Sequence, residues 1–130
     1  MSRLLFVDDD VQQIGIRKLL LEAAGHQVMV AEDVASAERL LVELQPEIMV
    51  MDLHMPTLKD GLALIRYVAE QRLGVAIIVL SGWTEELCDL PEEKMVASVI
   101  GKPFRNDELL SAINAAAVCA PARNPAEVVS

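Results

Sequence analysis

Apolar residues occur in short runs separated by polar turns, and five of these runs have the length of a strand. The run over residues 48–52, Ile-Met-Val-Met-Asp, starts with four apolar residues without alternation, which is typical of a strand buried on both faces of a parallel sheet. Residues 75–80 form a second run of this kind. Shorter or half-polar runs over residues 4–7, 27–30 and 97–101 predict three more strands.

Helical spacing of apolar residues fills most of the intervals between these strands. Residues 11–24 predict a helix that ends at Gly25, and its expected inner face carries Ile16, Leu19, Leu20 and Ala23. Three further helices are expected where a polar side chain can cap the first turn, at Asp33, Asp60 and Asn106.

The least regular part of the chain covers residues 84–95. It is short and acidic, and it contains Pro91, which a helix tolerates only in its first turn. We expect a broken or shortened helix here, restarting at Pro91. Strands and helices otherwise alternate, which predicts a (βα)5 domain with a parallel sheet and helices on both faces. We expect this domain to cover residues 1–118, followed over 119–130 by a tail or the start of a linker, with no output domain.

Composition narrows the class of protein. The chain has 130 residues, 53% of them hydrophobic, which suffices for one domain with a substantial core. The net charge is −9 and aromatic residues make up 3%, so we expect no nucleic-acid binding by this chain alone. No apolar run has the length of a membrane span, and Cys88 and Cys119 are too few for a disulfide framework. We therefore expect a cytoplasmic protein without a membrane partner.

Polar side chains end four of the five predicted strands. Three aspartates at 8–10 follow the first strand, Asp52 ends the third, Ser81 follows the fourth and Lys102 follows the fifth. The carboxyl ends of parallel strands meet at one edge of a sheet, which is where such sheets bind ligands. Carboxylates that lie within ~4 Å repel each other by several kcal/mol at intermediate dielectric, unless they are protonated or hold a cation. Oxygen ligands without histidine or cysteine side chains favour Mg²⁺ over zinc.

This arrangement suits phosphoryl transfer to Asp52. A carboxylate can attack phosphorus and form an acyl phosphate, and the protein then mainly positions the group and neutralises its charge. We expect Mg²⁺, the Lys102 ammonium and the Ser81 hydroxyl to meet its oxygens. Backbone N–H groups after Asp52 and Ser81 would add donors, and Gly82 would keep that approach open.

Five short motifs occur in order, each at the end of its own element. They are Phe-Val-Asp-Asp at 6–9, Met-Asp-Leu-His-Met-Pro at 51–56, Asp-Gly-Leu at 60–62, Val-Leu-Ser-Gly at 79–82 and Gly-Lys-Pro-Phe at 101–104. Together they resemble the response-regulator receiver domain of two-component (phosphorelay) signalling, similar to single-domain chemotaxis-type regulators, over about residues 3–117. The resemblance implies a flavodoxin-like three-layer sandwich with strand order 2-1-3-4-5.

The resemblance also implies roles for individual residues. Asp52 would accept the phosphoryl group of a histidine kinase or histidine phosphotransfer protein. Mg²⁺ would be bound by Asp9, Asp52 and the backbone carbonyl of His54, and by Asp8 through water. Lys102, before a cis Pro103, would contact the phosphoryl group together with Ser81 and Gly82. Phosphorylation would then shift the surface of strand 4, helix 4, strand 5 and helix 5, which a downstream protein would read. Such a domain is a phospho-acceptor, with at most self-catalysed phosphorylation and dephosphorylation, and not otherwise an enzyme.

Some positions depart from the family pattern or have a simpler interpretation. Val99 lies where the family commonly has an aromatic switch residue. His54 and Trp83 occupy two positions whose side chains, in this family, tune the lifetime of the acyl phosphate. Asp10 is interpreted as a helix cap. The acids at 85, 86, 92 and 93 are most simply a solvated face.

Two alternative functions stay open at this point. The first is a phosphorylation-independent interaction module, motivated by Val99 and by the irregular residues 84–95. The second is a phosphatase of the haloacid-dehalogenase type, in which the Asp-x-Asp start would make Asp8 the nucleophile. Gln12 stands where that motif has threonine or valine, which disfavours this alternative.

Overall fold

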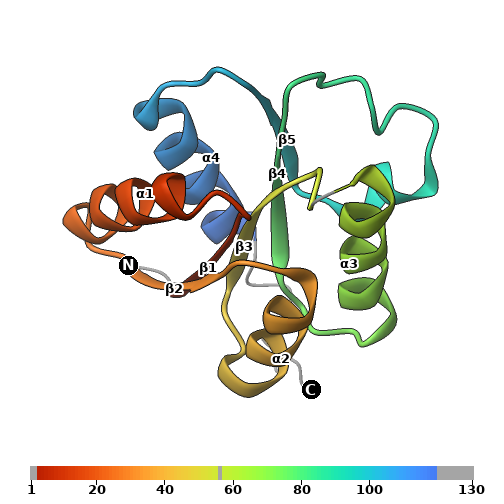
Figure 1. The fold of residues 1–130 in the computed structure, drawn as a ribbon, viewed down its shortest axis with the longest axis horizontal. Helices are drawn as coiled ribbons and strands as arrows, with labels where there is room; N and C mark the ends of the chain where they lie inside the picture. The colour runs from red at the N-terminus through yellow and green to blue at the C-terminus, as the bar shows by residue number, and fades with distance from the viewer. Residues whose placement is uncertain (1–2, 56, 120–130) are drawn as a thin grey trace.

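The computed structural model describes residues 3–55 and 57–119 and contains one parallel five-stranded sheet (Figure 1). The strand order is β2-β1-β3-β4-β5, as the resemblance implied, and each strand lies within one residue of its predicted bounds. The strands are β1 (Arg3–Val7), β2 (Gln27–Ala31), β3 (Ile48–Asp52), β4 (Ala76–Ser81) and β5 (Ser98–Gly101). The predicted tail begins at residue 119, and its residues 120–130 lie outside the described residues.

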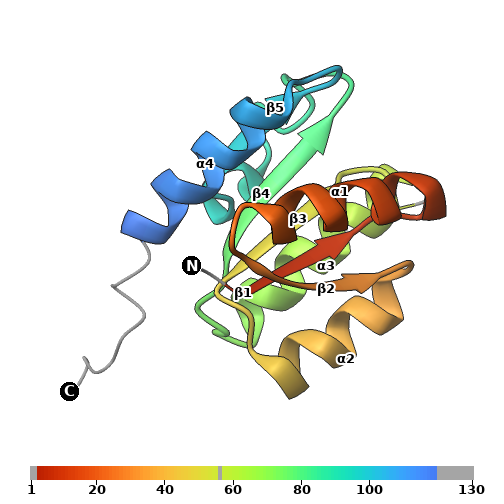
Figure 2. The ribbon, with the colours of Figure 1, turned by 90° about the vertical axis from the view of Figure 1, so that its left-hand side faces the viewer.

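Helices cover both faces of the sheet, which makes three layers (Figures 1 and 2). On one face, α1 (Val11–Ala23) and α4 (Asn106–Cys119) pack on strand residues such as Phe6, Val50 and Leu80. On the other face, α2 (Val34–Leu44) and α3 (Leu58–Glu70) pack on Met49 and Val79. All four residues Ile48–Met51 are fully buried, because β3 lies between β1 and β4 with helices above and below. The central strand is therefore buried on both faces, as its apolar sequence predicted.

Three of the α-helices, α1, α2 and α3, begin at a side-chain cap, and the starts of α3 and α4 differ from the prediction. Asp33 caps α2 by accepting a hydrogen bond from the Ser36 N–H, as predicted. For α3 the cap is Thr57, and Asp60 is its partner in a capping box, where each side chain accepts from the other residue's N–H. Asn106 is the first residue inside α4 and not its cap. Both errors arose because the sequence offers several polar residues near each start.

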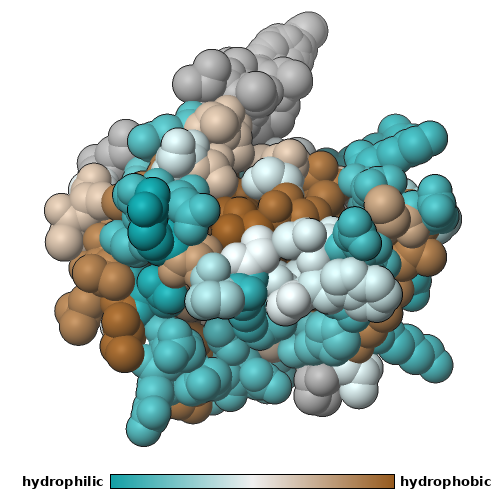
Figure 3. All heavy atoms as spheres, turned by 90° about the horizontal axis from the view of Figure 1, so that it is seen from above, coloured by the Kyte–Doolittle hydropathy of each residue, from teal (hydrophilic) through white to brown (hydrophobic). Residues whose placement is uncertain are grey.

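The buried face of α1 is also not the predicted one. Ile14 and Leu21 are buried, whereas Ile16 and Leu19 are 52% and 70% exposed. This helix carries apolar residues around much of its circumference, so its spacing alone does not select a face. Figure 3 shows hydrophobic surface at its left edge, the side on which Figure 1 places α1. The arginine between the two buried positions, Arg17, stacks on the Phe104 ring with 4.5 Å between its Cζ and the ring centroid.

The fourth βα unit lacks its α-helix. Residues 82–97, called here the 82–97 segment, form turns and one short 3₁₀ helix, η1 (Pro91–Met95), which begins at the proline as predicted. The broken, shortened helix expected in this unit is thus confirmed, and the described residues hold four α-helices and this one 3₁₀ helix. The segment still covers the sheet, because Leu87 is buried to 1% exposure and joins the core under α2 and α3.

An ion pair fastens this segment to α3. Arg66 Nη1 donates to Glu92 Oε2 at 2.6 Å, and the Glu92 side chain is only 7% exposed. The interpretation of residues 85, 86, 92 and 93 as a solvated face is therefore wrong for Glu92. Its hydrogen bond with Arg66 holds the pKa of the Glu92 carboxyl below its ordinary value, against the opposing effect of burial.

Replacing Glu92 by glutamine should weaken the fold in a pH-dependent way. A carboxyl whose pKa is lowered by folding contributes stability above its unfolded-state pKa and loses it as the pH falls through its folded-state pKa. We expect Glu92→Gln to lower the free energy of unfolding at pH 7 by about 1 kcal/mol, since Arg66 is half exposed and screened by solvent. Urea titrations from pH 7 to pH 3 check this, with exposed Glu93→Gln as the control. An equal loss at pH 7 and pH 3 would contradict this role for the ion pair.

Candidate phosphorylation and metal site

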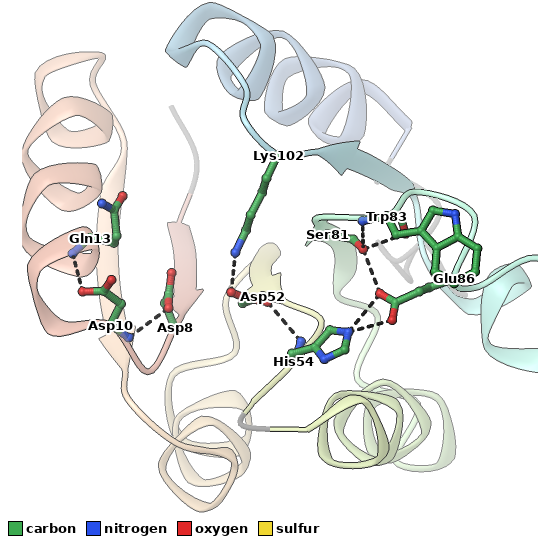
Figure 4. Close-up of polar contacts among 9 residues, drawn as sticks. All are labelled: Asp8, Asp10, Gln13, Asp52, His54, Ser81, Trp83, Glu86 and Lys102. Atoms are coloured by element: carbon green, nitrogen blue, oxygen red, sulfur yellow. Dashed lines mark hydrogen bonds and ion pairs between the residues drawn. The ribbon is translucent and has the colours of Figure 1, made fainter.

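The carboxyl ends of four strands align at one edge of the sheet. In the register of the sheet Val7 lies beside Met51, Asp52 beside Leu80 and Ser81 beside Gly101. The residues that end or follow these strands therefore come together, and Figure 4 shows Asp8, Asp52, Ser81 and Lys102 around one space. The sequence prediction placed these side chains at this edge.

Asp52 and Lys102 form the central contact of the site. The Lys102 Nζ lies 2.5 Å from Asp52 Oδ2, and the other carboxylate oxygen, Oδ1, accepts a hydrogen bond from the His54 N–H at 3.0 Å. The Asp52 side chain is 14% exposed and that of Lys102 is 38% exposed. The peptide bond between Lys102 and Pro103 is cis. Asp52 is thus reachable from solvent, and one cation is already paired with it.

The three aspartates after β1 have different surroundings. Asp8 is buried to 5% exposure, and its Oδ1 accepts a hydrogen bond from the Asp10 N–H at 2.9 Å. Burial raises the pKa of the Asp8 carboxyl; the Asp10 hydrogen bond opposes this rise, and the charge of Asp52 adds to it. Asp9 is exposed. Asp10 accepts from the N–H groups of Gln12 and Gln13 and caps α1, as interpreted from the sequence.

The donor set around Asp8 and Asp52 suits a hard divalent cation. The candidate ligands are carboxylate and peptide oxygens, which Mg²⁺ prefers. Among residues 3–55 and 57–119, no three His, Cys, Asp or Glu side chains are already gathered as a metal cluster. The carboxylates of Asp8 and Asp52 would share such a cation with peptide oxygens and water. A cation here would also offset the burial of the Asp8 carboxylate, so the residues present fit Mg²⁺.

Ser81 lies at the edge, but its hydroxyl is turned toward the 82–97 segment (Figure 4). Its Oγ lies 2.8 Å from the Trp83 carbonyl oxygen and 3.0 Å from Glu86 Oε1, and it accepts from the Trp83 N–H at 3.0 Å. The Ser81 residue is 1% exposed. At Gly82 a Cβ would meet no atom within 4 Å, so packing in this structure does not require a glycine there.

Glu86 belongs to this site, although its position in the sequence did not suggest it. The His54 Nε2 lies 2.7 Å from Glu86 Oε2 and 3.0 Å from Oε1, and the Glu86 side chain is 13% exposed. Together with Asp52 and Lys102, these two residues, Gly82 and Trp83 line an open hollow of about 360 Å³. Glu86 lies in an aperiodic acidic stretch, so only its distance of five residues from Ser81 could have indicated its place. The solvated-face interpretation is wrong for Glu86 as well.

The position of the family's aromatic switch residue holds a small side chain. Val99 is partly buried and packs against the core beneath the 82–97 segment. Two residues later, Gly101 faces Thr84, whose Cγ2 would lie 2.8 Å from a Cβ at position 101. The last strand and the start of the segment therefore pack closely here without a ring between them.

The fold and this edge define a flavodoxin-like α/β domain with an acidic site and a paired lysine at the strand ends. The family model described as the response regulator receiver domain matches residues 4–114, and the chain belongs to this family. The family assignment leaves the haloacid-dehalogenase interpretation, with Asp8 as nucleophile, without support. In the described residues, no helix combines the length and hydropathy needed to cross a membrane.

Relatives and solved structures agree with this assignment. The virulence transcriptional regulatory protein PhoP of Salmonella typhimurium is 32% identical over 118 residues, covering 88% of this chain and 51% of PhoP. The chain thus spans about half the length of the curated relatives it matches. The Francisella response regulator 1452 receiver domain superposes with a TM-score of 0.80 at 27% identity, covering 89% of this chain and 96% of that one. TrrA from Thermotoga maritima, in complex with Mg²⁺–BeF, shares the fold with a TM-score of 0.79 at 23% identity, covering 89% and 99%.

Proposed function

We propose that Asp52 accepts a phosphoryl group from a histidine kinase or histidine phosphotransfer protein, as receiver domains generally do. The observation that carries this proposal is the Asp52–Lys102 pair, 2.5 Å apart and beside the buried Asp8. A carboxylate at a strand end with an adjacent ammonium has both a nucleophile and a charge partner for the incoming group. The receiver would span residues 1–118 of a cytoplasmic protein.

The residues of the site account for the steps of the transfer. An oxygen of Asp52 attacks phosphorus, the bond from phosphorus to the donor's imidazole nitrogen breaks, and the electron pair leaves with the imidazole. The developing charge lies on the phosphoryl oxygens, where the Lys102 ammonium, the Ser81 hydroxyl and nearby backbone N–H groups can donate. Hydrolysis of the acyl phosphate by water resets Asp52. These are single-turnover events on the chain's own side chain, so the protein is not an enzyme in the usual sense.

A magnesium ion would be held by Asp9, Asp52 and the backbone carbonyl of His54, with Asp8 acting through water. When bound, it would supply positive charge to a phosphoryl oxygen. Asp8 lies near Asp52 and Asp9 follows it in the chain, so these two carboxyl groups after β1 would give this role its electrostatic basis. Asp9 is exposed and Asp8 is buried. The family pattern assigns the direct metal contact to Asp9 and the water-mediated contact to Asp8.

The output of the domain would be a shift of the surface formed by β4, the 82–97 segment, β5 and α4. An acyl phosphate on Asp52 would draw the Ser81 hydroxyl toward it and release the contacts that this hydroxyl makes in the segment. The downstream protein would distinguish the two states only if it contacts residues that differ between them. The 82–97 segment takes the place of the fourth helix in this mechanism.

A mass measurement tests the proposal. Incubation with Mg²⁺ and a small acyl phosphate or phosphoramidate donor should add one phosphoryl mass to the wild-type chain and none to Asp52→Asn. Chelation of Mg²⁺ should abolish the addition, because no divalent cation then offsets the negative charge of the phosphoryl group. Equal modification of wild type and Asp52→Asn would refute Asp52 as the acceptor.

Val99 supports a second candidate, a receiver fold that binds its partner independently of phosphorylation. Without a ring at this position, one component of the family's switch is missing. In that case Asp52 would take up the phosphoryl group while amide exchange in the 82–97 segment stayed unchanged. A change in this exchange on phosphorylation would favour the first candidate.

A further inference from the structure

Glu86 connects the phosphorylation site with the 82–97 segment. Its Oε1 lies 3.0 Å from the Ser81 Oγ, and both of its oxygens lie within 3.0 Å of the His54 Nε2. Ser81 ends β4, and His54 follows β3 and the acceptor Asp52. One carboxylate therefore ties the ends of two strands to the segment between β4 and β5 (Figure 4).

The hydrogen bond from Ser81 to Glu86 competes with the one that a phosphoryl group would need. A serine hydroxyl has one proton, and here it has two acceptors, the Trp83 carbonyl oxygen and the Glu86 carboxylate. The bond to the carboxylate is charge-assisted and so the stronger of the two. An acyl phosphate on Asp52 can receive this proton only after Glu86 has released it.

The negative charge of Glu86 also opposes binding of a phosphoryl group, in addition to the hydrogen bond with Ser81. Its side chain is 13% exposed and lines the same hollow as Asp52 and Lys102. An anion that enters this hollow meets a carboxylate already present. Lys102 is paired with Asp52, and His54 is paired with Glu86, which keeps that carboxylate in place.

We propose that Glu86 acts as an internal anion, which holds the Ser81 hydroxyl in the unphosphorylated arrangement and lowers the affinity of the site for a phosphoryl group. Glu86 is a positioning residue, because its hydrogen bonds go to Ser81 and His54 and it acts through Ser81. This inference rests on the proposed function of Asp52. It adds the residue that sets the equilibrium between the two states, and it explains how the 82–97 segment is moved, because releasing Ser81 also frees Glu86.

Binding of beryllofluoride, a phosphoryl analogue, tests the inference without turnover. Trp83 is the only tryptophan of the chain, and it lines the same hollow as Asp52 and Lys102, so its fluorescence should report binding with or without the Ser81 hydroxyl. In the presence of Mg²⁺, we expect Glu86→Ala to bind beryllofluoride about tenfold more tightly than wild type, because one charge-assisted hydrogen bond no longer has to be broken. Glu86→Gln should shift the affinity in the same direction by less, since its amide oxygen can still accept from Ser81.

A double-mutant cycle with Ser81→Ala separates positioning from simple charge repulsion. If Glu86 acts mainly through the hydroxyl, removing Glu86 in the Ser81→Ala background should change the affinity by about threefold or less, the part that its screened charge contributes. A tenfold effect that persists in this background would overturn the inference, and so would equal affinities of wild type and Glu86→Ala. Exposed Glu85→Ala, which removes a neighbouring charge from the same segment, should leave the affinity unchanged.

Two controls keep this result separate from other failures. If wild type and Glu85→Ala show no Mg²⁺-dependent binding of beryllofluoride, the proposed function itself fails, and this inference fails with it. If wild type binds but both Glu86 variants match it, only the inference fails. Urea midpoints establish that each variant is folded, and Glu86→Gln, which keeps the size of the side chain, carries the test if Glu86→Ala unfolds.

Discussion

Gly61→Ala is expected to lower the free energy of unfolding by about 3 kcal/mol or more, because the added methyl group has no space. A Cβ at this position would lie 1.7 Å from the Leu53 carbonyl oxygen and 2.8 Å from its carbonyl carbon. Both are backbone atoms, and Leu53 is fully buried, so no side-chain rotation relieves the clash. The first turn of α3 would have to move away from the loop that follows Asp52.

Gly15→Ala is the matched control for this substitution. Gly15 also lies in a helix, α1, but it is exposed and a Cβ there would meet no atom within 4 Å. Alanine should therefore stabilise the protein by about 0.5–1 kcal/mol through helix propensity and a smaller loss of chain entropy. Urea denaturation measures both variants. Midpoints that shift in the same direction would contradict the close approach of Gly61 to Leu53.

Lys102→Met is expected to slow Mg²⁺-dependent phosphoryl uptake by about a hundredfold, the usual effect of removing one donor to developing negative charge. The Lys102 ammonium is the cation placed 2.5 Å from Asp52, and methionine keeps most of its length without the charge. The unphosphorylated protein should stay folded, because the Lys102 side chain is 38% exposed and not part of the core. The rate of the mass increase with a small phosphoryl donor measures the effect.

Lys94→Met serves as the control for the loss of one positive charge. Lys94 is exposed in η1 and is not among the residues that line the hollow around Asp52. Its removal changes the net charge equally and should alter the rate by less than about threefold, the scale of a screened surface charge. A Lys102→Met rate within threefold of wild type would contradict the role proposed for this lysine.

The sheet could be predicted because each strand is a short apolar run that can be recognised from its own sequence. Residues 48–51 are apolar without alternation, and the structure buries all of them, so local pattern and tertiary surroundings agree. The meeting of Asp52 and Lys102 followed from the same reasoning, since parallel strands bring their carboxyl ends to one edge. Here topology alone determined which side chains became neighbours.

Other features depended on packing that no local pattern records. The face of α1 is selected by what the sheet offers to Ile14 and Leu21, because the helix itself is apolar around much of its circumference. Glu86 reaches Ser81 and His54 through an irregular segment, where neither helical nor strand periodicity indicates a direction. The cap of α3 was misplaced for a related reason, since Thr57 and Asp60 are both good caps and only the backbone decides between them.

The 82–97 segment has a further consequence for how the domain can open. Its backbone hydrogen bonds are largely local, such as those from the Glu86 N–H to Trp83 and from the Leu90 N–H to Leu87. Its anchors include Leu87 in the core, with Leu90 and Val96 packed against the same core, Glu92 on α3, and Glu86 at the strand ends. Such a segment can exchange between arrangements as a cooperative unit of its own, below the global unfolding free energy. Loss of the Glu86 anchor would then leave a flap that pivots on the remaining anchors, and a rearrangement of this kind needs no helix to unwind.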